Sequence, residues 1–162
     1  MSPTTKPMFS LVIPARYGAV DLRGCFPRIP VAQVRIDKEL REFAKTAPST
    51  QYSLEQPLPC EMEKASDGGV LSSLLGLTDK TKLNVDQVCA IMVYFGTDGW
   101  RFLELPSQKK EISILMGYVP VGGKHYAVMI EHEYNNGKEE IDLHVRKPGH
   151  QEYGPVLVLK IT

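Results

Sequence analysis

The sequence predicts a β-dominated α+β domain built on an antiparallel meander, and the turn signals of its second half lead to this expectation. Between residues 86 and 161 of the 162-residue chain, apolar runs are separated by short segments rich in glycine and asparagine. These segments are Gly96-Thr97-Asp98-Gly99, Gly122-Gly123, Asn135-Asn136-Gly137 and Pro148-Gly149. Glycine, and asparagine to a lesser degree, tolerates positive φ, so such segments close hairpins between neighbouring strands. Because many of the runs are apolar on both faces, we expect a sandwich or a partly closed barrel.

The expected strands are the apolar runs between these turns. In the second half they are Asp86–Phe95, Trp100–Leu105, Glu111–Val119, Lys124–Tyr134, Glu139–Val145 and Tyr153–Ile161. In the first half they are Met8–Ile13, Val31–Ile36 and Thr50–Leu54. The run over Tyr153–Ile161 is long and apolar, so it must be buried on both faces or pair with another subunit.

One or two short helices are expected in the first half of the chain. Asp37 suits the N-cap position, and the apolar residues after it, at spacings of three and four, share one helical face. This pattern predicts a helix over Asp37–Lys45 that ends before Pro48. A second short helix is expected over Val70–Leu75, with Gly76 as its C-terminal stop.

Composition indicates one globular domain, since 43% of the residues are hydrophobic and 23% are charged. Residues 1–7 are polar and contain two prolines, so we expect a disordered tail before a single domain over residues 8–162. No apolar run approaches the roughly 18 residues that span a bilayer. The first apolar stretch is also too short for the core of a signal peptide.

The cysteines favour a cytoplasmic or other intracellular protein. Cys25, Cys60 and Cys89 are widely spaced and odd in number. This arrangement is typical of reduced thiols. We therefore expect the three side chains to act as small buried hydrophobes.

The charge of the chain is zero overall but unevenly distributed. Residues 1–48 contain eight basic against four acidic residues, and residues 49–162 contain eleven against fifteen. Five of the early basic residues are arginines: Arg16, Arg23, Arg28, Arg35 and Arg41. Arginine suits the recognition of phosphate and carboxylate groups, so these residues are candidates for an anionic partner such as nucleic acid or lipid head groups. The simpler interpretation is that they pair with the acidic half of the same domain.

The turn at Asn136-Gly137 predicts the register of one hairpin. Ile130 then lies opposite Leu143, and the face that they share is apolar. The predicted pairs on the other face are Glu133 with Glu140, Glu131 with Asp142, and Met129 with His144. Four carboxylates and a histidine are therefore expected together, although directly opposed like charges cost stability.

The turn at Gly122-Gly123 predicts that an apolar floor continues this acidic face. The candidate interaction patch is Ile112, Ile114, Met116, Tyr118, Glu131, Glu133, Glu140 and Asp142. The helix over Asp37–Lys45 would cover the apolar part in one interpretation, and a basic or amphipathic partner would cover it in another. The carboxylates suit Ca²⁺ or Mg²⁺, but no loop has the spacing of such ligands, so we expect no metal site and no cofactor.

The sequence contains no complete catalytic motif and favours a protein that is not an enzyme. His132 and His144 lie near carboxylates in the expected hairpin, yet no nucleophile elbow, zinc-binding helix or phosphate-binding loop accompanies them. We therefore expect histidines on a solvent-facing strand.

These observations favour a non-catalytic interaction or assembly protein, which is a self-associating, matrix- or shell-like subunit that forms a homo-oligomer or binds a protein partner. One alternative is a small-molecule carrier with an apolar barrel interior lined by Met116, Tyr118, Met129 and Phe102. The other is a small hydrolase or transferase that uses His132, His144 and the carboxylates of residues 124–145.

Overall fold

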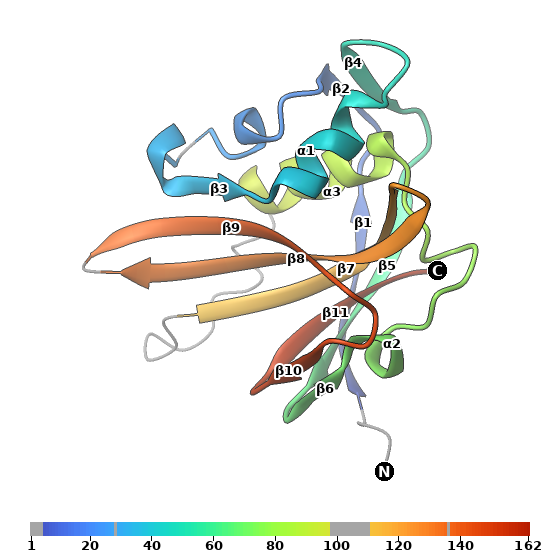
Figure 1. Ribbon diagram of the computed structural model, residues 1–162, viewed down its shortest axis with the longest axis vertical. Helices are drawn as coiled ribbons and strands as arrows, with labels where there is room; N and C mark the ends of the chain where they lie inside the picture. Colours follow the sequence, from blue (N-terminus) through green and yellow to red (C-terminus); the bar gives the residue numbers. More distant parts are fainter. Residues whose placement is uncertain (1–4, 28, 98–110, 136) are drawn as a thin grey trace.

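A seven-stranded sheet is the framework of the protein (Figure 1). The computed structural model describes residues 5–27, 29–97, 111–135 and 137–162. Strands make up 50% of the structure and helices 22%, so the predicted β-dominated α+β class is confirmed. In order across the sheet, the strands are β1 (Thr5–Ile13), β5 (Leu58–Ala65), β11 (Val156–Ile161), β7 (Glu111–Val121), β8 (Lys124–Asn135), β9 (Lys138–Arg146) and β3 (Val34–Ile36).

Smaller elements surround this sheet. Two short ladders join β2 (Arg16–Ala19) to β4 (Gln51–Leu54), and β6 (Gly68–Val70) to β10 (Gln151–Tyr153). The helices of the described residues are α1 (Lys38–Lys45), α2 (Leu71–Leu74) and α3 (Val85–Thr97), with 3-10 turns η1 (Arg23–Cys25) and η2 (Val31–Gln33).

The predicted antiparallel meander is confirmed for β7, β8 and β9, which are neighbours both in the chain and in the sheet. Two other pairings are parallel, β11 with β7 and β3 with β9. In Figure 1, β8 and β9 run across the view while β1 runs nearly vertically, so the sheet is strongly twisted. Its two end strands, β1 and β3, are not paired with each other, and the sheet therefore stays open instead of closing into a barrel.

The prediction of a strand over Asp86–Phe95 is wrong, because these residues belong to α3. The helix is buried on most of its sides, so its sequence is a continuous apolar run without helical periodicity. Its start is a capping box in which the side chains of Asn84 and Gln87 each accept a hydrogen bond from the other residue's backbone N–H, at 2.8 and 3.0 Å. The expected strand Trp100–Leu105 lies outside the described residues.

The last strand, β11, lies in the middle of the sheet between β5 and β7. Of the expected strand Tyr153–Ile161, the first residue ends β10 and the last six form β11, and Gly154 between them has a φ of +83°. Residues 156–159 are all buried, so β11 satisfies the expectation of burial on both faces. Its neighbour β5 was not expected from the sequence.

The first half of the chain contains most of the elements expected there. The helix predicted over Asp37–Lys45 is α1, and the shorter α2 lies within the predicted Val70–Leu75. Residues 5–7, which were expected in the tail, belong to β1. The run Val31–Ile36 divides into η2 and β3, so only its second half is a strand.

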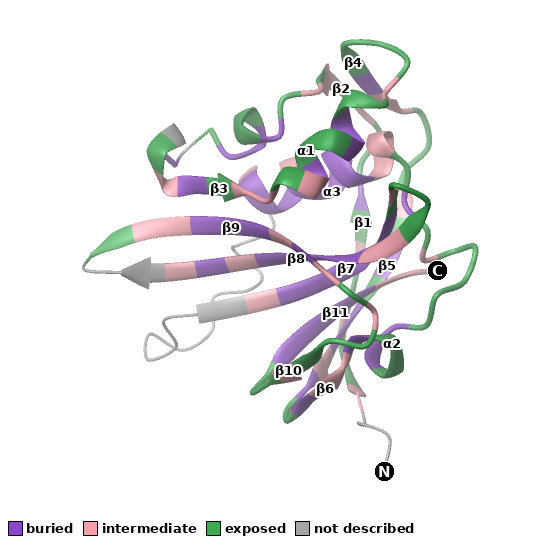
Figure 2. Cartoon of the chain, in the orientation of Figure 1, coloured by how far each residue is buried: buried purple, intermediate pink, exposed green. Residues whose placement is uncertain are grey.

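Two apolar cores lie on opposite faces of the sheet, because side chains alternate along each strand. The larger core includes Leu40 and Phe43 of α1 together with Ile130 and Leu143 of the sheet, and α3 also contributes to it. The smaller core is covered by α2. Figure 2 shows the buried residues along the middle of β7, β8 and β9. On the face of the sheet that holds the smaller core, the ends of β8 and β9 that lie away from α2 carry polar side chains. We call this region the open face.

Candidate functional site

The acidic part of the predicted patch lies together on the open face. The β8–β9 register is confirmed pair by pair, with Glu131 opposite Asp142 and Glu133 opposite Glu140. Glu131, Glu133 and Glu140 are partly exposed, and Asp142 is buried.

The apolar part of the predicted patch is not a floor beside these acids. The register expected from Gly122-Gly123 holds for Tyr118 opposite Ala127, but a bulge at Met116 shifts the pairing by one residue beyond it. As a result Ile114 and Met116 lie in the larger core and Tyr118 lies in the smaller one, all fully buried. The side chain of Ile112 lies outside the described part of the structure.

The bulge occurs where the chain segment before α3 docks onto β7. The N–H of Tyr118 donates to the carbonyl of Thr81 at 2.8 Å, and the Tyr118 carbonyl accepts from the N–H of Leu83 at the same distance. A side chain on Gly117 would begin 2.7 Å from the Thr81 carbonyl oxygen, so only glycine fits this crossing. This long-range contact could not be expected from the hairpin pattern.

The carboxylates of the open face are paired within the chain. Arg35 of β3 contacts Glu140 at 2.8 Å and Asp142 at 3.4 Å, which confirms the intradomain interpretation for this arginine. His144 Nε2 lies 3.1 Å from Glu131, and its Nδ1 lies 3.7 Å from Asp37 at the start of α1. The open face is therefore an ion-pair network that ties β3 and α1 to the hairpin.

The network shifts the pKa values of its members. The hydrogen bond with Glu131 raises the pKa of His144, and the same hydrogen bond lowers the pKa of Glu131. Burial raises the pKa of Asp142. At neutral pH the Glu131 carboxylate is thus ionised and accepts a hydrogen bond from the His144 ring.

Three residues of this network have ligand atoms close enough together for a metal ion. One atom each from Glu131, Asp142 and His144 lies within 4.8 Å of the others. Asp142 is already beside the Arg35 guanidinium, and the His144 ring is already held by Glu131. A positive side chain next to a ligand disfavours a cation, so the arrangement is that of an internally neutralised cluster.

The two histidines of the catalytic alternative lie on opposite faces of the sheet. His132 is opposite Ile141 and is buried on the side of the larger core, where its Nε2 lies 2.6 Å from Glu139. His144 is opposite Met129 on the other face. The two rings therefore cannot act on one substrate. Of the residues expected to line the interior of a carrier, Met116, Tyr118 and Met129 are packed in the two cores, and Phe102 lies outside the described residues.

The five arginines of the first quarter do not form one surface. Arg35 belongs to the ion-pair network, Arg16 lies on β2, and Arg28 is outside the described residues. Arg23 and Arg41, in contrast, line the same cavity.

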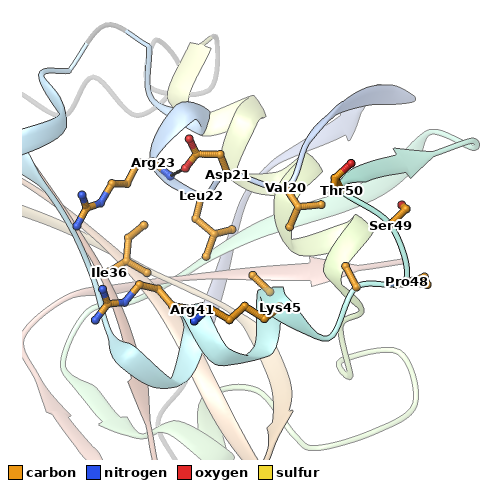
Figure 3. Close-up of a pocket in the computed structure, with 12 residues that line it drawn as sticks. Val20, Asp21, Leu22, Arg23, Ile36, Arg41, Lys45, Pro48, Ser49 and Thr50 are labelled. Carbon is orange, nitrogen blue, oxygen red and sulfur yellow. Dashed lines mark hydrogen bonds between the residues drawn. The ribbon is translucent and has the colours of Figure 1, made fainter.

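This cavity, called the cationic pocket below, has a volume of about 550 Å³ and lies between α1 and the chain around η1 (Figure 3). Its third cation is Lys45, which the sequence pattern did not single out. In Figure 3 the Lys45 side chain extends toward Arg41, and the Arg23 and Arg41 guanidinium groups lie at the same end of the pocket as Ile36. The remaining walls are Val20, Asp21, Leu22, Ile36, Ala44, Ala47, Pro48, Ser49 and Thr50.

Local structure explains why the cations converge. Arg41 and Lys45 are four residues apart on α1 and therefore lie on one helical face. Arg23 is brought to them by η1, whose start is tied by a hydrogen bond from its backbone N–H to the Asp21 carboxylate at 3.1 Å. The N–H of Val20 donates to the Thr50 carbonyl at 3.0 Å and joins the two walls.

The electrostatics of the cationic pocket favour anions. Arg23, Arg41 and Lys45 are all exposed, and none forms an ion pair with a carboxylate of the residues described. The single acid of the lining, Asp21, is engaged by the η1 backbone. Three cations beside apolar walls can hold a phosphate or carboxylate group while the walls contact an apolar body.

No protein-family model matches the sequence, and searches for similar curated proteins and for similar solved structures return no match. Among the described residues, no helix combines the length and the apolar character needed to cross a bilayer.

Proposed function

We propose that the protein is a non-catalytic binding protein whose cationic pocket takes an amphipathic anion, with a phosphate or carboxylate at the cations and an apolar body against the walls. The observation that supports this most directly is the convergence of Arg23, Arg41 and Lys45 on one cavity without ion-pair partners among the described residues. Cations that converge on a concave site without forming ion pairs are typical of anion recognition.

The shape of the pocket narrows the class of ligand. Its volume lies within the range of small-molecule sites, roughly 300–1,000 Å³. Among the described residues that line it, none is aromatic, so the base stacking that binds single-stranded nucleic acid has no platform there. Of the anionic partners expected from the sequence, an anionic lipid head group with the start of its apolar chain fits this pocket better than nucleic acid does.

A set of three small probes tests both halves of the proposal. 1-Naphthyl phosphate carries an anion and an apolar body, inorganic phosphate carries only the anion, and 1-naphthol carries only the apolar body. Calorimetric titration is expected to give the tightest binding for naphthyl phosphate, with an affinity that falls as salt is added, because the cations are exposed.

Matched variants locate the site. Arg41→Gln and Arg23→Gln are each expected to weaken naphthyl phosphate binding by about tenfold or more, the loss of one charge-assisted hydrogen bond. Lys38→Gln is the control, because Lys38 lies on the same helix, pairs with Glu42 and does not line the pocket. Equal binding of naphthol and naphthyl phosphate, or equal effects of Lys38→Gln and Arg41→Gln, would contradict the proposal.

A further inference from the structure

β1 lies at one edge of the seven-stranded sheet. It has nine residues, whereas β3 at the opposite edge has three, and no described strand pairs with its outer side. An edge of this kind presents backbone N–H and C=O groups that another chain can pair with. Val12, near the end of β1, is also 56% exposed although it is apolar.

The register shows which backbone groups face outward. The Thr162 N–H donates to the Pro59 carbonyl at 3.0 Å, so the backbone groups of Pro59 point toward β11. Val12 lies directly opposite Pro59 in the β1–β5 ladder. In an antiparallel ladder, the two residues of a pair direct their backbone N–H and C=O groups either both toward each other or both away from each other. Since the backbone groups of Pro59 point away from β1, those of Val12 point away from β5, toward the outer side of the sheet. Two residues earlier, Ser10 does the same.

The row of outward-pointing backbone groups on β1 is short because both of its ends are blocked. The bulge between Pro7 and Phe9 interrupts the strand on one side, and Pro14, which has no N–H, follows the strand on the other. Between them, only Ser10 and Val12 present both a donor and an acceptor. A partner can therefore form a limited ladder here, and the row cannot extend into an open-ended stack.

We propose that two copies of the chain pair through β1, antiparallel, about a two-fold axis between their Leu11 residues. Ser10 of each copy then lies opposite Val12 of the other, and the two pairs exchange four backbone hydrogen bonds. The two sheets become one continuous sheet across the dimer, with a closed, self-complementary interface.

The composition of β1 favours a second copy over a different chain. A strand that pairs with itself places its own charges close to equal charges, which is destabilising. Residues 9–13 carry no charge, so self-pairing meets no such repulsion. In this register the Leu11 side chains of the two copies lie opposite each other. Leu11 is half-buried in the monomer and gains apolar contact in the dimer.

Substitution of Val12 separates the backbone from the side chain. Val12→Pro removes the outward N–H without breaking the β1–β5 ladder, and proline is tolerated at such edge positions. Val12→Ala is the matched control, because it trims the side chain and keeps the N–H. Sedimentation across a dilution series is expected to give a dimer of the 18.1 kDa chain for the parent and Val12→Ala. Val12→Pro is expected to raise the dissociation constant by about tenfold or more.

Cysteine cross-linking tests the register and does not depend on how Val12→Pro folds. Opposed residues in a non-hydrogen-bonded antiparallel pair have Cα atoms about 4.5 Å apart, within disulfide range. Leu11→Cys is therefore expected to give a cross-linked dimer on mild oxidation. Ser10→Cys, whose copies are out of register, is expected to stay monomeric under denaturing conditions. A monomer at every concentration, a dimer unaffected by Val12→Pro, or cross-linking through Ser10→Cys in preference to Leu11→Cys would each overturn the proposal.

Discussion

The backbone carbonyl oxygen of Cys25 lies only 1.9 Å from the place where a side chain on Gly96 would begin. Gly96 is near the end of α3, and Cys25 ends η1, so this contact lets the turn rest directly on the helix. η1 also carries Arg23 of the cationic pocket. The absence of a side chain at residue 96 thus sets how closely that wall of the pocket approaches the larger core.

Gly96→Ala is expected to destabilise the protein even though alanine favours helices. The added methyl group forces η1 away from α3, which costs about 1–3 kcal/mol. For a chain of this size the melting temperature is expected to fall by roughly 2–4 °C for each kcal/mol lost. Gly76→Ala is the control, because its nearest neighbour atom lies 4.0 Å away and its φ is not positive. An unchanged melting temperature for Gly96→Ala would show that η1 does not rest on α3.

The Glu131–His144 pair predicts a pH dependence of stability. Because the folded-state pKa of His144 is raised above 6.5, its contribution is complete below pH 6.5 and is lost as the pH rises through that raised value. The folded-state pKa of Glu131 is lowered below 4.5, so its contribution is complete above pH 4.5 and is lost as the pH falls through the lowered value. The pair therefore contributes most between pH 4.5 and 6.5.

Urea unfolding at a series of pH values checks this window. The difference in unfolding free energy between the parent and Glu131→Gln is expected to be about 1 kcal/mol at pH 5–6 and to shrink toward pH 8. A difference that is constant from pH 5 to pH 8 would mean that His144 and Glu131 do not titrate as a pair.

Tyr118→Phe tests the link between β7 and α2. The buried Tyr118 hydroxyl donates to the carbonyl of Leu75, and it lies 3.5 Å from that of Leu71. Phenylalanine removes the hydroxyl donor and leaves the buried Leu75 carbonyl without its hydrogen bond. The substitution is expected to lower the free energy of unfolding by about 1–2 kcal/mol. Tyr153→Phe, at a tyrosine that is 85% exposed, is expected to change the unfolding free energy little. Equal effects of the two substitutions would argue against the hydroxyl contact.

The three thiols are expected to react only when the protein unfolds. Cys25, Cys60 and Cys89 are buried, as the sequence predicted, and burial raises the pKa of each to about 12. Little thiolate is then present at neutral pH, and reagents cannot reach it. An assay with a thiol-specific disulfide reagent is expected to release almost no colour from the native protein and three equivalents in denaturant. Rapid labelling of one thiol in the native state would identify a cysteine with an accessible thiolate.

Local pattern was sufficient where neighbours in the sheet are neighbours in the chain. The turn at Asn136-Gly137 and the alternation around it predicted every β8–β9 pair correctly, including Glu131 opposite Asp142. The turn at Gly122-Gly123 did not predict the bulge at Met116 in β7, which lies beside the place where Tyr118 contacts Thr81, a residue far away in the sequence.

Buried elements were harder to predict. Residues 86–95 form an apolar run in which a buried helix and a buried strand look alike. The capping box of Asn84 and Gln87 was the signal that could have identified α3. For β5, the alternation of Cys60 and Met62 with Glu61 and Glu63 was visible in the sequence, but the prolines before it obscured the strand.

The candidate site was predicted only in part. The arginine-rich first quarter contains Arg23 and Arg41, and the four-residue spacing of Arg41 and Lys45 was also visible in the sequence. Nothing local indicates that η1 and the segment after α1 meet, since a tertiary hydrogen bond between Val20 and Thr50 joins them. The concave shape of the site is therefore a product of the whole fold.

The central place of β11 has a consequence for biosynthesis. Residues 156–161 leave the ribosome after every other strand of the sheet, yet they lie between β5 and β7. Until then the nascent chain can hold only two partial sheets, each with an open edge where β11 belongs. Insertion of a strand between two preformed edges requires contacts of long sequence separation, which form slowly. The sheet is therefore completed only after all its other strands have been synthesised, and until then its unfinished edges are exposed to aggregation.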